Sequence, residues 1–180
     1  MGKTILIVDD DPAQRRLLQA AVERNGFLTR AAENGAQAVE AVEKHADIDI
    51  VLLDLVMPGM TGQEALKEIR QRRGDLPAIV LTASGGIDTV VQAMQAGASD
   101  FFVKPASPER IMVSIRNALE MSNLKTEVVR MKKRVAGQMS FDDMVANAPV
   151  MAPVVRMGKR AAASNIPVLI TGESGVGKEL

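Results

Sequence analysis

The sequence predicts an α/β fold in which helices cover both faces of a doubly wound, five-stranded parallel sheet. From Thr4 to about Met121, short apolar runs alternate with stretches whose apolar residues recur at helical spacing, the pattern of repeated strand and helix units. The runs IVLL and AIVL contain no polar residue. Such runs are expected for central parallel strands, which are buried on both faces.

Five strands and five helices are expected in this region. The strand segments are TILIV, LTRAA, IVLLD, AIVLT and FFV, and the helical segments are residues 12–24, 35–44, 61–72, 87–96 and a last helix that begins at Ser107. Pro108 and Glu109 after Ser107 are typical of a helix start. The alternation favours a flavodoxin-like sheet, in which ligands bind outside the carboxyl ends of the strands.

Length and composition narrow the class of protein further. A chain of 180 residues accommodates one complete domain and a remainder. No apolar run approaches the roughly 20 residues of a membrane span, and the acidic N-terminus does not resemble a cleavable signal, so we expect a cytoplasmic protein without membrane insertion. The absence of Cys excludes disulfides and thiolate metal sites. The net charge is zero, with a mild acidic excess in residues 1–120 and a mild basic excess in residues 121–180. This asymmetry is too weak to indicate nucleic-acid binding, which usually shows a concentrated basic face.

Polar residues stand at four of the predicted strand ends. Asp9 and Asp10 follow the first strand, Asp54 ends the third, Thr82 ends the fourth, and Lys104 follows the fifth. These ends lie along one edge of a parallel sheet. Clustered carboxylates need a cation, and oxygen ligands favour a hard ion such as Mg²⁺. Together with a lysine and a hydroxyl, the cluster predicts a site at which an aspartate accepts a phosphoryl group.

Each residue also has an ordinary structural interpretation. The acidic pair could cap the following helix, although Asp11 is the expected cap. Thr82 alone would be a strand-end hydroxyl, and Lys104 alone a solvated charge. Their joint occurrence at several strand ends favours the phosphoryl-accepting site.

The segments ILIVDDDP, LLDLVMPGMTG, LTA and GASDFFVKP resemble the motifs of response-regulator receiver domains over residues 1 to about 121. The resemblance implies that Asp54 is the phosphorylated aspartate and that Asp9 and Asp10 are the acidic pair that holds Mg²⁺. Asp10 and Asp54 would be the direct ligands, together with the backbone carbonyl of Val56.

The same resemblance implies roles for residues around this centre. Thr82 is similar to the switch hydroxyl, Lys104 to the phosphoryl-binding lysine, and Phe101 to the switch aromatic. Pro105 corresponds to the residue that fixes the lysine loop, often through a cis peptide. Gly62 matches the loop after the acceptor, where we expect it to supply a positive φ. Ala106 departs from the family, which commonly has Phe there.

The last receiver helix has no obvious end before Gly137, so one or two helices are expected. Met121, Leu124, Val128, Met131 and Val135 follow a 3-4 spacing over about two heptads. Either a short coiled coil that makes a homodimer or an amphipathic linker helix fits this pattern. The expected domains are a receiver at residues 1–121, a helical linker at 122–140 and a further fragment at 141–180.

The C-terminal segment reads as loop, helix, strand and Gly-rich loop. VLITGESGVGKEL places Gly172, Gly175, Gly177 and Lys178 after an apolar run, the order of a phosphate-binding P-loop, although Glu179 stands where the general motif has Ser or Thr. Together with FDDMVANAPVM, it resembles the start of the ATPase of sigma-54-dependent transcription activators, where Glu is usual. A chance Gly-rich loop is the alternative.

The combined prediction is a two-component response regulator rather than an enzyme. A sensor histidine kinase would phosphorylate Asp54, and the receiver would then switch a sigma-54-dependent ATPase. ATP would serve only the full-length protein, and contacts with DNA and sigma-54 RNA polymerase would need regions beyond Leu180. An aspartyl-phosphate hydrolase is disfavoured, because its nucleophile follows the first strand. A single-domain receiver is disfavoured by the linker and the ATPase-like tail.

Overall fold

The computed structural model describes residues 2–83, 85–135, 150–163, 169 and 171 of the chain. The chain divides into two compact units, Met1–Leu124 and Lys125–Leu180.

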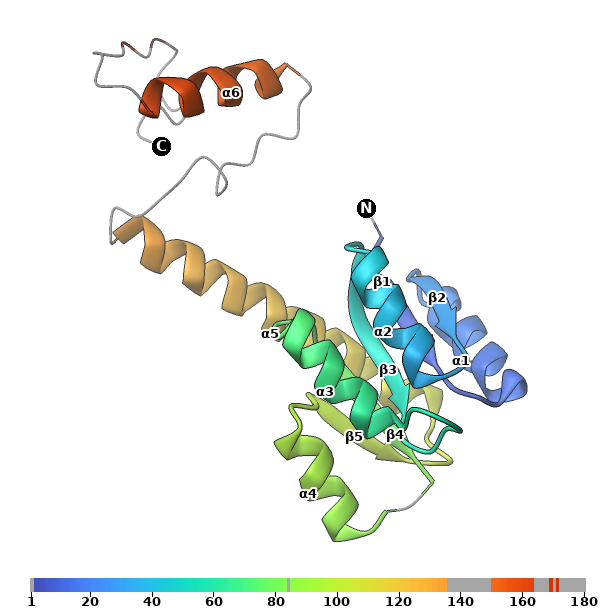
Figure 1. The fold of residues 1–180 in the computed structure, drawn as a ribbon. Helices are drawn as coiled ribbons and strands as arrows, with labels where there is room; N and C mark the ends of the chain where they lie inside the picture. The colour runs from blue at the N-terminus through green and yellow to red at the C-terminus, as the bar shows by residue number, and fades with distance from the viewer. Residues whose placement is uncertain (1, 84, 136–149, 164–168, 170, 172–180) are drawn as a thin grey trace. The chain divides into compact units, whose positions relative to one another are not determined.

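The first unit is built on a parallel sheet of five strands (Figure 1). The strands are β1 (Thr4–Val8), β2 (Leu28–Ala32), β3 (Ile48–Asp54), β4 (Ala78–Thr82) and β5 (Asp100–Val103). Their order is β2-β1-β3-β4-β5, and all four neighbouring pairs are parallel. This is the flavodoxin-like order, so the predicted fold class is confirmed.

Strand β3 begins at Ile48, earlier than its apolar run suggested, because Asp49 has partners at the start of the sheet. The Asp49 carboxylate accepts hydrogen bonds from the backbone N–H of Thr4 and from Lys3 Nζ, both at 2.8 Å. A polar residue therefore stands inside the strand without an unpaired charge.

Helices connect the strands and cover both faces of the sheet. They are α1 (Pro12–Arg24), α2 (Gly35–Lys44), α3 (Gly62–Arg72), α4 (Ile87–Gln95) and α5 (Pro108–Val135). Asp11 caps α1 as predicted, since its carboxylate accepts from the N–H groups of Ala13 and Gln14. Thr61 is the N-cap of α3 and forms a capping box with Glu64, which explains why this helix starts one residue after the predicted segment.

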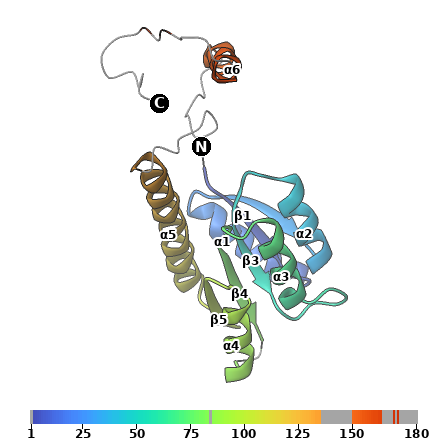
Figure 2. The same ribbon diagram turned by 60° about the vertical axis from the view of Figure 1, so that its left-hand side comes forward.

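Two apolar cores lie on opposite faces of the sheet. Leu6 and Val8 face the core that α2, α3 and α4 cover, whereas Ile5 and Ile7 face the core that α1 and α5 cover. The alternation follows from the two-residue period of a strand. Figure 2 shows α2 and α3 on one side of the sheet and α5 on the other. Together the cores fix the carboxyl ends of β1, β3 and β4, which are completely buried up to the site.

The region after residue 107 is one continuous helix up to Val135, which settles the choice between one helix and two. Its second half exposes the side chains of Met121, Leu124, Val128 and Met131, each about half accessible. Helix α6 (Met151–Ala162) confirms the helix predicted in the C-terminal segment. Among the described residues, no helix combines the length and apolarity needed to span a bilayer.

Candidate functional site

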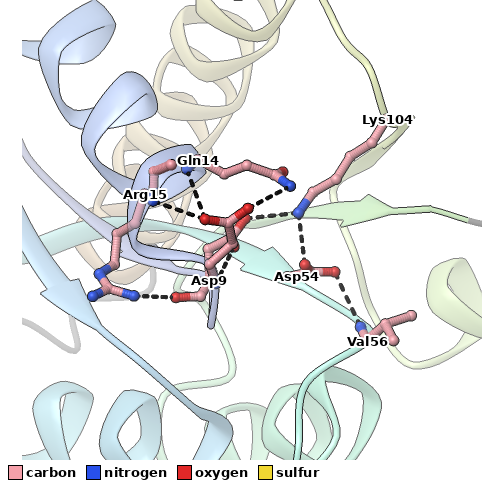
Figure 3. A network of polar contacts seen from close by, with 8 residues as sticks. Asp9, Gln14, Arg15, Asp54, Val56 and Lys104 are labelled. Carbon is pink, nitrogen blue, oxygen red and sulfur yellow. Dashed lines mark hydrogen bonds and ion pairs between the residues drawn. The ribbon is translucent and has the colours of Figure 1, made fainter.

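The candidate site lies at the carboxyl edge of the sheet, around the switch point between β1 and β3. Asp9 directly follows β1, and Asp54 is the last residue of β3. Lys104 follows β5 and reaches both of them (Figure 3). The sheet therefore brings together three residues that are far apart in the sequence, as the pattern of strand ends predicted.

Asp9 is completely buried, at 0% relative accessibility, and all of its polar groups have partners. Its Oδ1 accepts a hydrogen bond from the backbone N–H of Asp11 at 3.0 Å, and its Oδ2 accepts one from Lys104 Nζ at 2.7 Å. Its backbone N–H donates to the carbonyl of Ala32 at 3.3 Å, and its carbonyl accepts from Arg15 at 2.6 Å. The first acidic residue is thus held rigidly.

Asp54 is also buried, with 5% of its surface accessible. Lys104 Nζ donates to its Oδ2 at 2.6 Å, and the backbone N–H of Val56 donates to its Oδ1 at 3.0 Å (Figure 3). These two donors orient the carboxylate of Asp54 at the edge of the sheet. Val56 thereby lies at the site through its backbone, on the loop that carries the predicted carbonyl ligand.

Lys104 supplies the positive charge of the site. Burial by itself lowers the pKa of this amine, but the hydrogen bonds to Asp54 and Asp9 outweigh that effect and raise the pKa above the ordinary value for lysine. The amine is therefore charged at neutral pH. The backbone N–H of Lys104 donates to the carbonyl of Thr82 at 2.8 Å, and the peptide bond between Lys104 and Pro105 is cis.

Asp9, Asp10 and Asp54 can each point one carboxylate oxygen into a common space, with these oxygens within 4.8 Å of one another. Asp9 and Asp54 are buried, whereas Asp10 is exposed. The three carboxylates offer only hard oxygen donors, and their total negative charge exceeds the single positive charge of Lys104. This donor set fits a divalent ion such as Mg²⁺.

Thr82 and Phe101 lie near the edge on the other side of Asp54. The sheet pairs Asp54 with Leu81, so Thr82 stands one residue beyond the acceptor position, and only 1% of its surface is accessible. Phe101 in β5 is half-buried and packs against the core beneath α3 and α4. The predicted switch hydroxyl of Thr82 therefore lies at the carboxyl edge of the sheet, and Phe101 lies on the face of the sheet that α2, α3 and α4 cover.

Gly62 was expected to supply a positive φ in the loop after Asp54, and this prediction is wrong. Positive φ angles occur at Gly26, Gly59 and Gly97, and Gly59 is the one in the loop after Asp54. Gly62 instead permits a close approach, because a Cβ there would lie 1.9 Å from the carbonyl oxygen of Asp54. Its N–H also donates to the carbonyl of Leu55 at 3.1 Å. The start of α3 therefore rests directly on the backbone of the acceptor residue.

Arg15 was not anticipated from the sequence as part of the site. It follows the N-cap Asp11 by one helical turn, and its guanidinium reaches back to the carbonyl of Asp9. The available signal was this spacing, since a residue one turn after an N-cap lies beside the strand end that precedes the helix. The predicted nucleotide residues Gly172, Gly175, Gly177 and Lys178 lie outside the described residues. Of the strand predicted before them, Leu169 and Thr171 are described, without regular secondary structure.

A doubly wound sheet with an acidic pair after β1, an aspartate after β3 and a lysine after β5 defines the class of receiver domains. The sequence matches the response regulator receiver domain over residues 5–116 and the sigma-54 interaction domain over residues 144–180. The chain belongs to the response-regulator receiver family, and its receiver precedes the beginning of a sigma-54 interaction domain.

Individual relatives match either nearly the whole chain or about two thirds of it. The regulatory protein AtoC of Escherichia coli is 36% identical over 98% of this chain and 38% of its own length. The crystal structure of NtrX from Brucella abortus is 33% identical with a TM-score of 0.70 over 99% of this chain and 39% of that one. A CheY-like receiver domain protein from Methanospirillum hungatei JF-1 is 26% identical with a TM-score of 0.67, covering 69% of this chain and 99% of its own.

The chain thus spans less than two fifths of the length of AtoC and NtrX. Its receiver is followed by the beginning of a sigma-54 interaction domain, which is the order of sigma-54-dependent response regulators.

Proposed function

We propose that this receiver accepts a phosphoryl group on Asp54 from a phosphohistidine of a sensor kinase. The observation that carries the proposal is the arrangement of Asp54, whose two carboxylate oxygens are held by Lys104 Nζ at 2.6 Å and by the N–H of Val56 at 3.0 Å. The carboxylate is thereby oriented at the sheet edge where the acidic pair converges with it.

In the proposed reaction an oxygen of the Asp54 carboxylate attacks the phosphorus atom. The new oxygen–phosphorus bond forms as the phosphorus–nitrogen bond to the histidine ring breaks, and the ring nitrogen keeps the electron pair and takes a proton from solvent. The carboxylate is already ionised, so no general base is needed. Lys104 is placed to bind a phosphoryl oxygen, because its charged amine touches the nucleophile.

Asp9, Asp10, Asp54 and the Val56 carbonyl are the residues proposed to hold Mg²⁺. The ion would neutralise charge between the phosphoryl oxygens and the carboxylates. Asp9 and Asp10 therefore act as binding residues in this proposal, and Asp54 acts as both ligand and nucleophile.

The phosphorylated state is proposed to be recognised through Thr82 and Phe101. Thr82 supports this proposal because it is buried at the sheet edge, one residue beyond the register partner of Asp54. Phe101, a residue of β5, is half-buried against the core that α2, α3 and α4 cover. A change at Thr82 would be passed to the surface of α4 and β5 as a shift between two packed states.

Intact-mass measurement after incubation with acetyl phosphate and Mg²⁺ tests the assignment. The wild type should gain one phosphoryl group and Asp54→Asn none, whereas Asp10→Asn should lower the affinity for the ion and leave the nucleophile in place. Asp47→Asn, which makes the same change at an exposed aspartate just before β3, is the matched control and should be labelled like the wild type. Equal labelling of the wild type and Asp54→Asn contradicts the proposal.

A homodimer through the second half of α5 is proposed on the basis of its exposed apolar residues Met121, Leu124, Val128 and Met131. Full burial of one such side chain contributes roughly 1.5–3 kcal/mol, against an association cost of about 4–15 kcal/mol. A micromolar dimer that strengthens with salt is expected. Light scattering on polypeptides of residues 1–180 and 1–121 tests this. If both are monomers the dimer is excluded, and if both are dimers the contact lies in the receiver itself.

For the whole protein we propose control of a sigma-54-dependent ATPase, supported by the match over residues 144–180. A polypeptide limited to residues 1–180 is proposed not to bind or hydrolyse ATP, because a P-loop also needs Mg²⁺-holding acids and the following helix. Calorimetry with ATP and Mg²⁺ should detect no specific binding. A micromolar affinity that is lost in Lys178→Ala contradicts this.

A further inference from the structure

Arg15 makes an unusual pair of contacts beside the acidic pair. The residue lies in the first turns of α1, and only 12% of its side chain is accessible. Its guanidinium does not bind either carboxylate of the pair. Instead, Nη1 donates to the backbone carbonyl of Asp9 at 2.6 Å, and Nη2 donates to Glu33 Oε1 at 3.0 Å (Figure 3 shows the first contact).

The carbonyl that Arg15 binds belongs to the peptide bond between Asp9 and Asp10. A peptide unit is planar, so fixing its oxygen also fixes the direction in which the chain leaves for Asp10. The other polar groups of Asp9 are held by Ala32, Asp11 and Lys104. The bond from Arg15 is the contact that links this buried, rigid residue to the orientation of its exposed neighbour.

Glu33 holds the other end of the guanidinium. It lies in the loop between β2 and α2, and its own backbone N–H donates to Gln37 Oε1 at 2.9 Å. The fork of Arg15 therefore ties the start of α1, the end of β1 and the loop after β2 together. A lysine has one donor centre and cannot reproduce this two-sided contact.

The charge of Arg15 acts in the opposite direction to its geometry. A cation close to the acidic pair repels a second cation, so removing it should tighten metal binding if charge alone mattered. The ion pair with Glu33 reduces that repulsion. The orientation effect and the charge effect therefore predict opposite changes in metal affinity.

We infer that Arg15 is a positioning residue for the metal site: by holding the peptide between Asp9 and Asp10, it directs both carboxylates toward the ion and Asp54. The inference rests on the proposed function, because the ion is the one proposed for phosphoryl transfer. Residues that orient metal ligands typically change metal affinity by about 10- to 100-fold when mutated.

Binding of Mn²⁺ measured by electron paramagnetic resonance tests this inference, since the chain has no Trp or Tyr to report binding by fluorescence. Arg15→Gln should weaken binding by about 10-fold or more, and Arg15→Lys should fall between it and the wild type. Arg16→Gln removes the same charge from an exposed position on the same helix and is the matched control, with an expected change below about 2-fold.

A second measurement separates positioning from a general loss of structure. Urea unfolding is followed in EDTA and in excess Mg²⁺, and the stabilisation by the metal should shrink in Arg15→Gln even if its stability in EDTA equals that of the wild type. Should Arg15→Gln fail to fold, the affinity of Arg15→Lys decides alone.

The outcomes distinguish the inference from the proposed function. If Arg15→Gln binds Mn²⁺ as tightly as Arg16→Gln, or more tightly, while the wild type binds the ion and Asp54→Asn resists labelling, the positioning role is refuted and the proposed function stands. If the wild type binds no metal, or Asp54→Asn is labelled normally, both the positioning role of Arg15 and the proposed function are refuted.

Discussion

Gly62→Ala is the substitution whose effect the structure defines most sharply. A Cβ at this position would lie 1.9 Å from the carbonyl oxygen of Asp54 and 2.7 Å from the Cα of Leu55. Since the nearest contacts of real Cβ atoms are 3.0 Å or longer, the start of α3 and the end of β3 must separate by about 1 Å. Both segments are buried backbone, so no flexible side chain can yield.

The size of the effect follows from opposing contributions. Overpacking of a well-packed site costs typically about 1–3 kcal/mol, and a backbone clash of this depth belongs at the upper end. Alanine recovers about 0.4–1 kcal/mol by restricting the unfolded chain. A net loss of about 2 kcal/mol in the free energy of unfolding is expected. Because the displaced group is the backbone of the proposed acceptor, the rate of labelling should fall by up to about 100-fold.

Urea unfolding followed by circular dichroism measures the first quantity, and intact-mass labelling over time measures the second. Gly74→Ala is the matched control, because the nearest atom to its added Cβ is the carbonyl oxygen of Arg70 at 3.3 Å. Its stability should change by less than about 0.5 kcal/mol. Equal unfolding midpoints for the two variants would refute the reasoning.

Two other substitutions test how the helices are attached to the sheet. Arg70→Ala leaves the carbonyl of Gly97 and the part-buried carbonyl of Leu76 without their guanidinium donors and should cost about 1–3 kcal/mol, more than Arg72→Ala, whose partner carboxylates on Glu43 and Glu68 are exposed. Denaturant midpoints of the two variants compare them. Asp11→Asn keeps a cap at α1 but removes a carboxylate whose pKa the N–H of Ala13 holds below 3.8. Because its pKa is lowered in the folded state, the ionised Asp11 stabilises the fold above pH 3.8, and this stabilisation is lost as the pH falls through the lower, folded-state pKa. The melting temperature of Asp11→Asn should therefore fall less steeply with decreasing pH in this range than that of the wild type.

The elements of the receiver were predictable because local and tertiary requirements agree in this sequence. Apolar runs such as AIVLT are buried from end to end, and the helices between them start at recognisable caps such as Asp11 and Thr61. The candidate site was predictable for a different reason. Parallel strands bring their carboxyl ends to one edge, so Asp9, Asp54 and Lys104 could be grouped without knowing any distance.

Other features depended on contacts that no local pattern encodes. The start of β3 depends on partners for Asp49 at the start of the neighbouring strand β1, in Lys3 and Thr4. The need for Gly62 arises from the distance between α3 and Asp54, which only packing determines. The partner of Arg15 is a backbone carbonyl, and backbone acceptors are identical in every residue of a sequence.

The charges at the sheet edge support the proposal that one group added to Asp54 changes the state of the domain. Asp9, Asp10 and Asp54 together with Lys104 carry a formal charge of −2, which a divalent ion would cancel. Phosphorylation of Asp54 replaces one negative charge with about two, so the balanced site would become negative again.

The excess negative charge would then need another hydrogen-bond donor. Thr82 is buried at the same edge, one residue beyond the register partner of Asp54. Movement of its hydroxyl toward the new group would leave space beside β4. On β5 the register partner of Thr82 is Val103, and the half-buried Phe101, which pairs with Val80, lies two residues before it. In the proposed function, a local change of one charge would thereby be converted into a change of packing on the α4 side of the sheet.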